Sequence, residues 1–341
     1  MMKAITLNLS QSSNTSEWFS ETEIETPVPS SRDLLVHVKA ISVNPVDYKA
    51  RASLPMQHPS KILGWDASGI VEAVGKEVTL FKPGDEVYYA GSFTRAGSNS
   101  EYHVVDERLV GKKPTSLSFE QAAALPLTTI TAWEALFERL GIEPQTTSHN
   151  QSSTLLIIGG AGGVGSIAIQ LAKQVAGMRV IATASRPETI NWCQKMGADD
   201  TINHHHPFKS ELATIGVDHV DYILCLHDTD QYLQNMVDVI KPQGKICSIV
   251  STDQPFDLNL FFSKSVTFVW EMMFTKSMYE TADIQSQHEL LNRVATLIDR
   301  GILKTTLTEN LGVLSSINLV KAHQLLAAGT TIGKVVLSGI H

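Results

Sequence analysis

The sequence predicts an α/β protein that combines a doubly wound parallel sheet with a β-rich, barrel-like domain. Three observations predict this class. Apolar residues alternate with other residues in parts of the first third of the chain, a period typical of half-buried strands. Beyond residue 154, short apolar runs alternate with helical stretches, as in a parallel sheet with helices on both faces. A glycine-rich turn joins the first of these runs to a helix.

The β-rich part is predicted from short alternating segments. Strands are expected at residues 34–41, 69–74 and 86–89. The tripeptide Pro83-Gly84-Asp85 supplies turn chemistry before the third of them. An irregular antiparallel or barrel-like domain follows from these segments.

Helices and buried strands are predicted in the rest of the chain. Helices are expected at 120–125 and 131–140, followed by a polar connector at 141–153. Four short apolar runs predict buried strands at 155–158, 180–184, 222–226 and 246–250. Two C-terminal helices are expected at about 290–298 and 318–328, each followed by a glycine, Gly301 and Gly329.

Composition excludes several classes of protein. The chain has 27 Lys and Arg against 35 Asp and Glu, so its formal net charge of -8 disfavours nucleic acid and anionic lipid as partners. No apolar run approaches the ~18 residues that a membrane span needs. The cysteines, Cys193, Cys225 and Cys247, show no spacing typical of a disulfide framework or a zinc lobe. We therefore expect a two-domain cytoplasmic protein with no nucleic-acid and no membrane partner.

The strongest motif is a G-x-G-x-x-G turn, Gly160-Ala161-Gly162-Gly163-Val164-Gly165, placed directly after the predicted strand 155–158. Glycines at a strand-to-helix turn allow backbone N–H groups and the positive helix end to hold a pyrophosphate. The residues after the turn have helical apolar spacing, which supplies the context that the motif requires. We therefore predict that Gly160, Gly162, Gly163, Val164 and Gly165 bind a dinucleotide. A glycine-rich turn without a ligand is the alternative.

The end of the second predicted parallel strand distinguishes NAD from NADP. An NAD enzyme places Asp or Glu about 20 residues past the last glycine, where the carboxylate binds the ribose 2′-hydroxyl. This chain has Ala184-Ser185-Arg186 there. Because the arginine can pair with a 2′-phosphate, Ser185 and Arg186 are predicted to bind NADPH. A solvated surface arginine is the alternative.

Several segments occur in an order and spacing that are specific as a set. They are Ile41–Asp47, Leu63–Gly69, Pro83–Val87, Thr131–Trp133, the glycine turn and Gly333–Leu337. In these segments the chain resembles the medium-chain dehydrogenase/reductases, and among them the zinc-free quinone oxidoreductase, or zeta-crystallin-like, branch. Residues 270–274 also look like a bacterial subgroup often labelled zinc-type alcohol dehydrogenase-like. The resemblance covers nearly the whole chain.

The resemblance implies a domain organisation and an assembly. A Rossmann dinucleotide-binding domain at residues 128–266 is expected to be inserted in a GroES-like catalytic domain, residues 1–127 with 267–341. A homodimer or homotetramer is expected.

A catalytic zinc is not expected. Zinc alcohol dehydrogenases hold the metal with a Cys, a His and a second Cys. Asn44 stands in the place of the first Cys and Trp65 in that of the His, and no cysteine precedes Cys193. The adjacent histidines at 204–206 lack the i, i+4 geometry of a ligand pair, so a solvated loop is favoured over a metal site there.

Conjugated substrates suit a site without zinc. An enone or quinone can accept hydride at carbon and delocalise the charge onto its oxygen. The resemblance places residues 44–51 beside the nicotinamide, so Asn44 and Tyr48 are the candidate catalytic donors. Quinone reductases commonly carry their tyrosine at the position of Lys49, which leaves solvent as an alternative proton donor to Tyr48. Asp47 and Asp66 are expected to hold loops through buried pairing, with Arg51 as a partner.

The resemblance also implies further cofactor contacts. Thr131 is expected at the nicotinamide side, and Ser248 and Val250 along the cofactor. Lys334 is expected to reach a phosphate or ribose, and His204 to lie near the adenosine phosphate. A structural role is the alternative for each of these residues.

The sequence therefore predicts an NADPH-dependent oxidoreductase that transfers hydride to a quinone or an α,β-unsaturated carbonyl without zinc. Two alternatives stay open. One is a zinc-dependent alcohol dehydrogenase, and the other is a non-catalytic, crystallin-like protein that binds NADPH.

Overall fold

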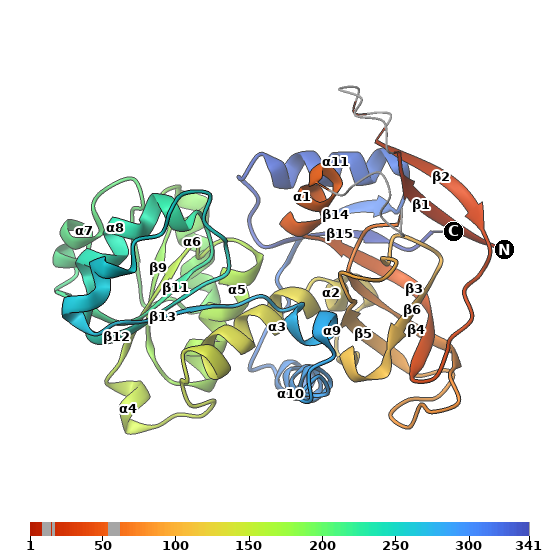
Figure 1. Ribbon diagram of the computed structural model, residues 1–341, viewed down its shortest axis with the longest axis horizontal. Helices are drawn as coiled ribbons and strands as arrows, with labels where there is room; N and C mark the ends of the chain where they lie inside the picture. Colours follow the sequence, from red (N-terminus) through yellow and green to blue (C-terminus); the bar gives the residue numbers. More distant parts are fainter. Residues whose placement is uncertain (9–14, 16–17, 54–61, 341) are drawn as a thin grey trace. The chain divides into compact units, whose positions relative to one another are not determined.

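The computed structural model describes residues 1–8, 15, 18–53 and 62–340 of the chain. The chain divides into two compact units (Figure 1). Unit one consists of Met1–Ile130 with Phe274–His341, and unit two of Thr131–Met273. The α/β class is confirmed, because unit one is rich in antiparallel strands and unit two holds a parallel sheet.

Unit one is built on a seven-stranded sheet. Six strands follow the order β14-β15-β3-β4-β5-β7, β6 pairs with β3, and β1 and β2 form a separate antiparallel pair. The strands are β1 Met2–Leu7, β2 Phe19–Ile24, β3 Asp33–Val43, β4 Asp66–Val74, β5 Glu86–Ala90, β6 Tyr102–Asp106, β7 Val110–Lys112, β14 Leu307–Val313 and β15 Lys334–Ser338. Apolar side chains of the long central strand β3, such as Leu34, Val36 and Ile41, are buried in the core of this unit.

Unit one also contains helical segments. They are α1 Pro45–Ser53, the 3-10 turn η2 Glu107–Leu109, α2 Phe119–Ala123, α9 Thr275–Tyr279, α10 Ser286–Asp299 and α11 Ser316–Ala327. The helix α3, Pro126–Trp133, runs across the boundary between the two units in the chain. Ser118 begins α2 with a capping box in which its hydroxyl accepts from the Gln121 backbone N–H.

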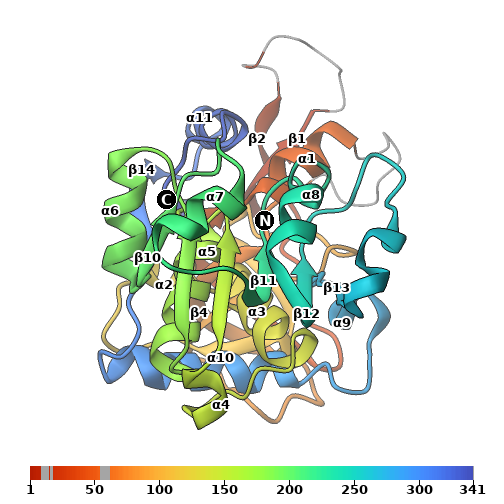
Figure 2. The same cartoon turned by 90° about the vertical axis from the view of Figure 1, so that its left-hand side faces the viewer.

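Unit two is a doubly wound sheet with strand order β10-β9-β8-β11-β12-β13, all parallel. Its strands are β8 Thr154–Ile158, β9 Arg179–Thr183, β10 Asp200–Ile202, β11 Val220–Cys225, β12 Ile240–Ser248 and β13 Thr267–Trp270. In chain order this is 3-2-1-4-5-6, with the reversal between β8 and β11, where α/β sheets bind their ligands. Figure 2 shows β11 and β12 side by side in this unit.

Helices of unit two are arranged in pairs: α5 packs with α6, and α7 packs with α8. They are η3 Glu134–Arg139, α4 Ser148–Gln151, α5 Gly163–Gln170, η4 Leu171–Val175, α6 Pro187–Met196, α7 Phe208–Thr214, α8 Thr229–Val239 and η5 Leu258–Lys264. The segments η3 and η4 are π-helical, and η5 is a 3-10 helix. Buried residues of α7 and α8, including Phe208 and Met236, join strand residues such as Ile223 in one apolar cluster.

Three local expectations need correction. The predicted helix 131–140 begins earlier, at Pro126, and its second half is a π-helix. The connector 141–153 holds the short helix α4, because the Thr147 hydroxyl accepts from the Asn150 N–H at 3.1 Å and caps it. The strand expected at 246–250 is the end of the longer β12, so Val250 lies beyond the sheet.

In the described part of the chain, no helix is both long enough and apolar enough to cross a bilayer.

Candidate functional site

The glycine turn between β8 and α5 requires glycine for steric reasons. A Cβ on Gly165 would lie 2.5 Å from the carbonyl oxygens of Gly159 and Gly160, and a Cβ on Gly160 would lie 2.7 Å from the Cβ of Ala182. Gly159 has a φ of +88°, a conformation that favours glycine. The turn therefore packs α5 closely on the end of β8, the arrangement that brings a helix N-terminus to a pyrophosphate.

The first turn of α5 is open to an anion. Gly162 caps the helix without a side-chain hydrogen bond, and the Ser166 N–H donates to the Gly162 carbonyl at 2.9 Å. Gly163, Val164 and Gly165 form the first turn, where backbone N–H groups have no partner inside the helix. This geometry fits the phosphates of a dinucleotide.

The predicted adenosine-end residues meet at the carboxyl edge of the sheet. Ser185 and Arg186 follow β9 after one residue, Ala184, and the Ser185 hydroxyl lies 3.5 Å from Nε2 of His204, which follows β10. Arg186 begins α6 with a half-exposed side chain whose Nε lies 3.4 Å from Glu188 Oε1. Burial, together with the charges of His205, His227 and Arg186, lowers the pKa of His204.

The three adjacent histidines have different polar surroundings, although the ring centroids of His204 and His205 lie 4.3 Å apart. His204 faces Ser185, whereas His206 Nδ1 lies 2.8 Å from a Glu211 oxygen and His205 is exposed. Among the described residues there is no group of three His, Cys, Asp or Glu side chains arranged to hold a metal ion.

The other half of the sheet carries the residues expected along the cofactor. Ser248 ends β12, and its hydroxyl lies 2.6 Å from that of Thr229, which also donates to the Val250 carbonyl at 2.5 Å. Thr131 is buried in α3. Thr229 was missed from the sequence, although its place directly after the predicted strand 222–226 was a signal. These contacts fix the loop after β12, where Val250 lies.

Unit one contains a buried network around Lys334. This residue is 3% exposed, and its ammonium donates to the Val43 carbonyl at 3.0 Å, Asn44 Oδ1 at 2.5 Å and Asp66 Oδ2 at 3.0 Å. Asn44 Nδ2 donates to the same Asp66 oxygen at 2.8 Å, and the Leu127 N–H donates to the other at 2.7 Å. Both Oδ1 and Nδ2 of the Asn44 amide therefore form hydrogen bonds inside the protein.

This network differs from two expectations. Lys334 was expected to reach a phosphate or ribose, but its three N–H donors are used inside unit one. Buried pairing of Asp66 is confirmed, with Lys334 as its partner in place of Arg51. The Arg51 guanidinium instead lies over the ring of Trp18, 3.5 Å from its centroid.

Helix α1 carries Asp47 and Tyr48 beside this network. Asp47 is 1% exposed, and its Oδ2 accepts from the Asn44 N–H at 2.5 Å, which closes the first turn of the helix. Burial raises the pKa of Asp47 to about 7, against the lowering effects of that N–H and of Lys334. Tyr48 is half-buried in the same turn.

Trp65 forms an aromatic wall in unit one. Its indole N–H donates to the Ser92 carbonyl at 3.1 Å, and its ring stacks on Phe93 at 5.1 Å and meets Phe274 edge-on at 5.8 Å. Phe274 lies in the segment 270–274 that the sequence analysis singled out, whereas Phe93 was not indicated. The wall is apolar, and its members Trp65 and Phe274 are buried.

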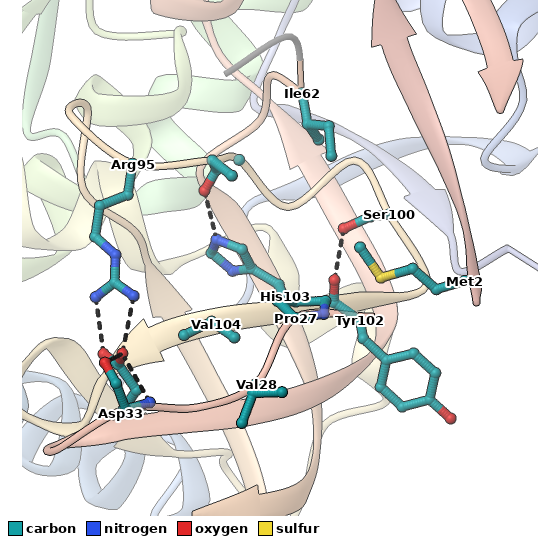
Figure 3. A pocket seen from close by; sticks show the side chains of 13 residues that line it. Met2, Pro27, Val28, Asp33, Ile62, Arg95, Ser100, Tyr102, His103 and Val104 are labelled. Atoms are coloured by element: carbon teal, nitrogen blue, oxygen red, sulfur yellow. Dashed lines mark hydrogen bonds and ion pairs between the residues drawn. The ribbon is translucent and has the colours of Figure 1, made fainter. Parts of the chain in front are cut away.

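A separate cavity of about 260 Å³ lies elsewhere in unit one (Figure 3). Figure 3 shows Arg95 paired with Asp33, at 2.8 and 3.1 Å, and His103 bonded to the Ala96 carbonyl. Burial lowers the pKa of His103 to about 4, so its ring is neutral. The described lining of this cavity includes none of the predicted catalytic or cofactor residues.

Two family descriptions match the chain. Residues 163–287 match "Zinc-binding dehydrogenase", and residues 30–115 match "Alcohol dehydrogenase GroES-like domain". A "Zinc-type alcohol dehydrogenase-like protein" from Staphylococcus epidermidis is 44% identical over 337 residues, 99% of each chain. A crystal structure from Rhizobium etli, provisionally named as a zinc-dependent alcohol dehydrogenase, has a TM-score of 0.94 and 47% identity, over 100% of this chain and 98% of that one.

More distant relatives have more specific names. A 2-methylene-furan-3-one reductase from Solanum lycopersicum is 30% identical over 94% of this chain and 75% of its own. The Escherichia coli quinone oxidoreductase complexed with NADPH has a TM-score of 0.81 and 25% identity, over 98% of this chain and 99% of that one. The chain thus belongs to the medium-chain dehydrogenase/reductase superfamily, in its quinone-oxidoreductase-like branch. It is an oxidoreductase of a family that binds NAD(P).

The residues of this chain do not fit the zinc that these family names imply. Asn44 and Trp65 stand where the family's Cys and His ligands would be, and the Trp65 indole nitrogen has no lone pair to offer a metal. The Lys334 ammonium lies 2.5 Å from Asn44 Oδ1, so a dication bound there would be repelled. No reaction step is therefore derived through zinc.

Asp47→Asn tests the buried carboxyl of α1. Because the pKa of Asp47 is raised to about 7 on folding, the folded state holds a proton that the unfolded state releases above its usual pKa. This contribution to stability is present at low pH and is lost as pH rises to about 7. We expect the free energy of unfolding of the wild type to fall by up to about 1.4 kcal/mol per pH unit between pH 5 and 7, and Asp47→Asn to flatten that slope.

Urea titrations at pH 5, 6 and 7 measure both slopes. Asp85→Asn is the matched control, because Asp85 caps a surface turn through the Lys82 N–H and should keep the wild-type slope. An unchanged slope in Asp47→Asn would show that another group is responsible.

Proposed function

We propose that this protein is an NADPH-dependent, zinc-free oxidoreductase that reduces quinones or α,β-unsaturated carbonyl compounds. The observation that carries the proposal is the Lys334–Asn44–Asp66 network. At the family's metal position, the ammonium of Lys334 bonds to the polar groups of Asn44 and Asp66. The 2-methylene-furan-3-one reductase and the quinone oxidoreductase among the relatives support the same substrate class.

The chemistry follows from the absence of metal ligands. A nicotinamide supplies hydride, and a conjugated substrate accepts it at carbon while the charge spreads to oxygen, which needs a hydrogen-bond donor and no Lewis acid. The aromatic wall of Trp65, Phe93 and Phe274 supports an apolar, flat substrate. A zinc alcohol dehydrogenase is disfavoured for the same reason, because an unactivated carbonyl needs metal polarisation.

Within this proposal Asn44 and Tyr48 have different roles. The Asn44 amide is held at both ends, so it lines the site and fixes the start of α1. Tyr48, one turn into that helix, is the proton donor to the substrate oxygen. Thr131, Ser248 and Val250 lie along the cofactor.

The test is NADPH oxidation with a panel of quinones, enones and simple ketones, in the presence of a strong chelator. We expect turnover with conjugated substrates, little with simple ketones, and far less than one equivalent of zinc by metal analysis. Tyr48→Phe should lower kcat by about 10²-fold while NADPH affinity stays within about twofold.

Loss of activity when the chelator removes a bound metal would establish a zinc-dependent alcohol dehydrogenase. A protein that binds NADPH but turns over no member of the panel would establish the non-catalytic alternative. Unchanged kcat in Tyr48→Phe would leave solvent as the proton donor.

NADPH is proposed over NADH because of the residues after β9. Ser185 and Arg186 stand where an NAD enzyme needs a carboxylate, and His204 lies beside them. The Arg186 side chain is 42% exposed, so solvent screens its attraction for a phosphate. A charge-assisted hydrogen bond from this arginine should therefore contribute a free energy at the lower end of the usual range. The NADPH complex in the relative from Escherichia coli supports the same choice.

Arg186→Ala tests the cofactor preference. A charge-assisted hydrogen bond of about 1.5 kcal/mol corresponds to about tenfold in affinity, so we expect the variant to bind NADPH about tenfold more weakly and NADH unchanged. Arg179→Ala is the control, because Arg179 begins the same strand and pairs with Asp200. Titration of both cofactors by tryptophan fluorescence measures the ratio, and equal wild-type affinities would refute the NADPH assignment.

We further propose that the protein is a homodimer or homotetramer that pairs through the edge strand β13. This strand ends the sheet of unit two, and unpaired edges with apolar side chains favour pairing with another copy. Exposed apolar residues gather on and beside it, namely Leu258, Leu260, Phe262, Trp270 and Met272. The Trp270 side chain packs on Phe268, which makes the surface continuous.

Trp270→Lys tests this surface. A charge on an apolar self-pairing edge disfavours association, so we expect light scattering after gel filtration to show a multiple of the chain mass in the wild type and the monomer in the variant. Tyr279→Lys is the control, because Tyr279 is an exposed aromatic residue of unit one. A monomeric wild type would contradict the proposal.

The proposed location is the cytoplasm. All three cysteines are buried and free, which suits a reducing compartment.

A further inference from the structure

A chain of hydrogen bonds runs from helix α6 to the glycine turn of unit two. The Trp192 indole N–H donates to the Ser166 hydroxyl at 2.8 Å, and that hydroxyl donates to the Gly162 carbonyl at 2.7 Å. The Ser166 backbone N–H donates to the same carbonyl at 2.9 Å. The next residue of α6, Cys193, is also close to the turn, since a Cβ on Gly160 would lie 3.1 Å from its Sγ. A residue of α6 therefore reaches the turn through one side chain of α5.

The direction of each bond in this chain is fixed. An indole nitrogen donates one hydrogen and accepts none, so the oxygen of the fully buried Ser166 is the acceptor in its bond with Trp192. The hydroxyl hydrogen of Ser166 is then directed at the Gly162 carbonyl, which receives two donors from the same residue. Because the hydroxyl is committed in this way, its hydrogen is not available to a phosphate.

The carbonyl that these bonds hold belongs to the peptide unit between Gly162 and Gly163. A peptide unit is planar and trans, so its C=O and N–H point in opposite directions. Since the Gly162 carbonyl is held along the axis of α5, the Gly163 N–H points out of the N-terminal end of that helix, where an anion binds. A rotation of the whole unit would instead turn the partial negative charge of the carbonyl outward and repel a phosphate.

Local chemistry makes this peptide unit easy to rotate. Its rotation requires a positive φ at residue 163, and glycine adopts that conformation without steric cost. The bond from the Ser166 N–H is the first of the helix, and helix ends fray. The second bond, from the Ser166 hydroxyl, therefore matters more here than it would in the middle of a helix, and Trp192 fixes the direction of that hydroxyl.

We propose that Trp192 is a positioning residue for the dinucleotide, because through Ser166 it holds the Gly162–Gly163 peptide unit and so keeps the Gly163 N–H directed at the pyrophosphate. Trp192 acts through Ser166 and is not itself a ligand. The inference rests on the dinucleotide site of the proposed function. It is independent of the substrate class and of the choice between NADPH and NADH, since both cofactors carry the pyrophosphate.

Trp192→Phe is the first variant, because phenylalanine keeps an aromatic ring and lacks the N–H. We expect the affinities for NADPH and NADH to fall by the same factor, about fivefold, which is the usual effect of one neutral hydrogen bond. Affinity for adenosine 2′-phosphate, which carries no pyrophosphate, should stay within about twofold of the wild type. Calorimetric titration measures all three ligands and does not depend on the fluorescence of the residue that is removed.

A double-mutant cycle with Ser166→Ala separates a positioning role from a general loss of packing. Because Trp192 acts through the Ser166 hydroxyl, Trp192→Phe should have no further effect on cofactor affinity once that hydroxyl is absent. Additive effects of the two substitutions on affinity, or unchanged affinity in Trp192→Phe alone, would overturn the proposal. The single variant decides the matter even where Ser166→Ala folds poorly, since an equal loss of affinity for all three ligands would also contradict a role at the pyrophosphate.

Tyr222→Phe is the matched control. Tyr222 is also an aromatic residue of unit two with a polar atom bonded to a side chain, since its hydroxyl lies 3.3 Å from His149 Nε2. It lies near the start of β11, whereas the glycine turn follows the end of the neighbouring strand β8. This variant should bind both cofactors as the wild type does. A wild type that binds neither NADPH nor NADH would instead refute the dinucleotide site itself.

Discussion

The ammonium group of Lys334 is the constraint on which the arrangement of unit one depends. It lies at the first position of β15 and bonds to Asn44 and Asp66, which are 290 and 268 residues away in the chain. β3 pairs antiparallel with both β15 and β4. The end of β3 therefore lies beside the starts of β15 and β4. Without this cation, the fully buried Asp66 would be an unpaired charge, which a protein interior does not tolerate.

Unit two depends on a different constraint, the close approach of backbone at its carboxyl edge. At the glycine turn, α5 packs closely against the end of β8 because Gly165 has no Cβ that would clash with the backbone. On the far half of the same sheet, Arg139 on η3 donates to Glu271, which follows β13, at 2.7 Å, so an ion pair joins the helical segment to that strand. Both contacts lie at the edge where a parallel sheet presents its ligand.

A shared fold leaves room for different chemistry at one position. The relatives carry names that refer to zinc, and the chain shares their fold over nearly its whole length. Asn44, Asp66 and Lys334 nevertheless satisfy one another, and the Trp65 indole N–H donates to the Ser92 carbonyl. The same residues hold the start of α1, the helix that carries Tyr48.

The sequence alone determined the class of fold and the predicted dinucleotide turn. Hydrophobic periodicity and motif spacing depend only on residues that are close together in the chain. Four strands of the parallel sheet, β8, β9, β11 and β12, the glycines at 160–165 and the residues after β9 belong to this group, whereas β10 and β13 were not predicted. Only the tertiary structure paired Lys334 with Asp66 in place of Arg51, placed Val250 beyond β12, and brought Arg139 to Glu271. Partners so far apart in the chain meet through strand pairing and packing. Local sequence patterns therefore do not predict which buried charged groups pair with each other.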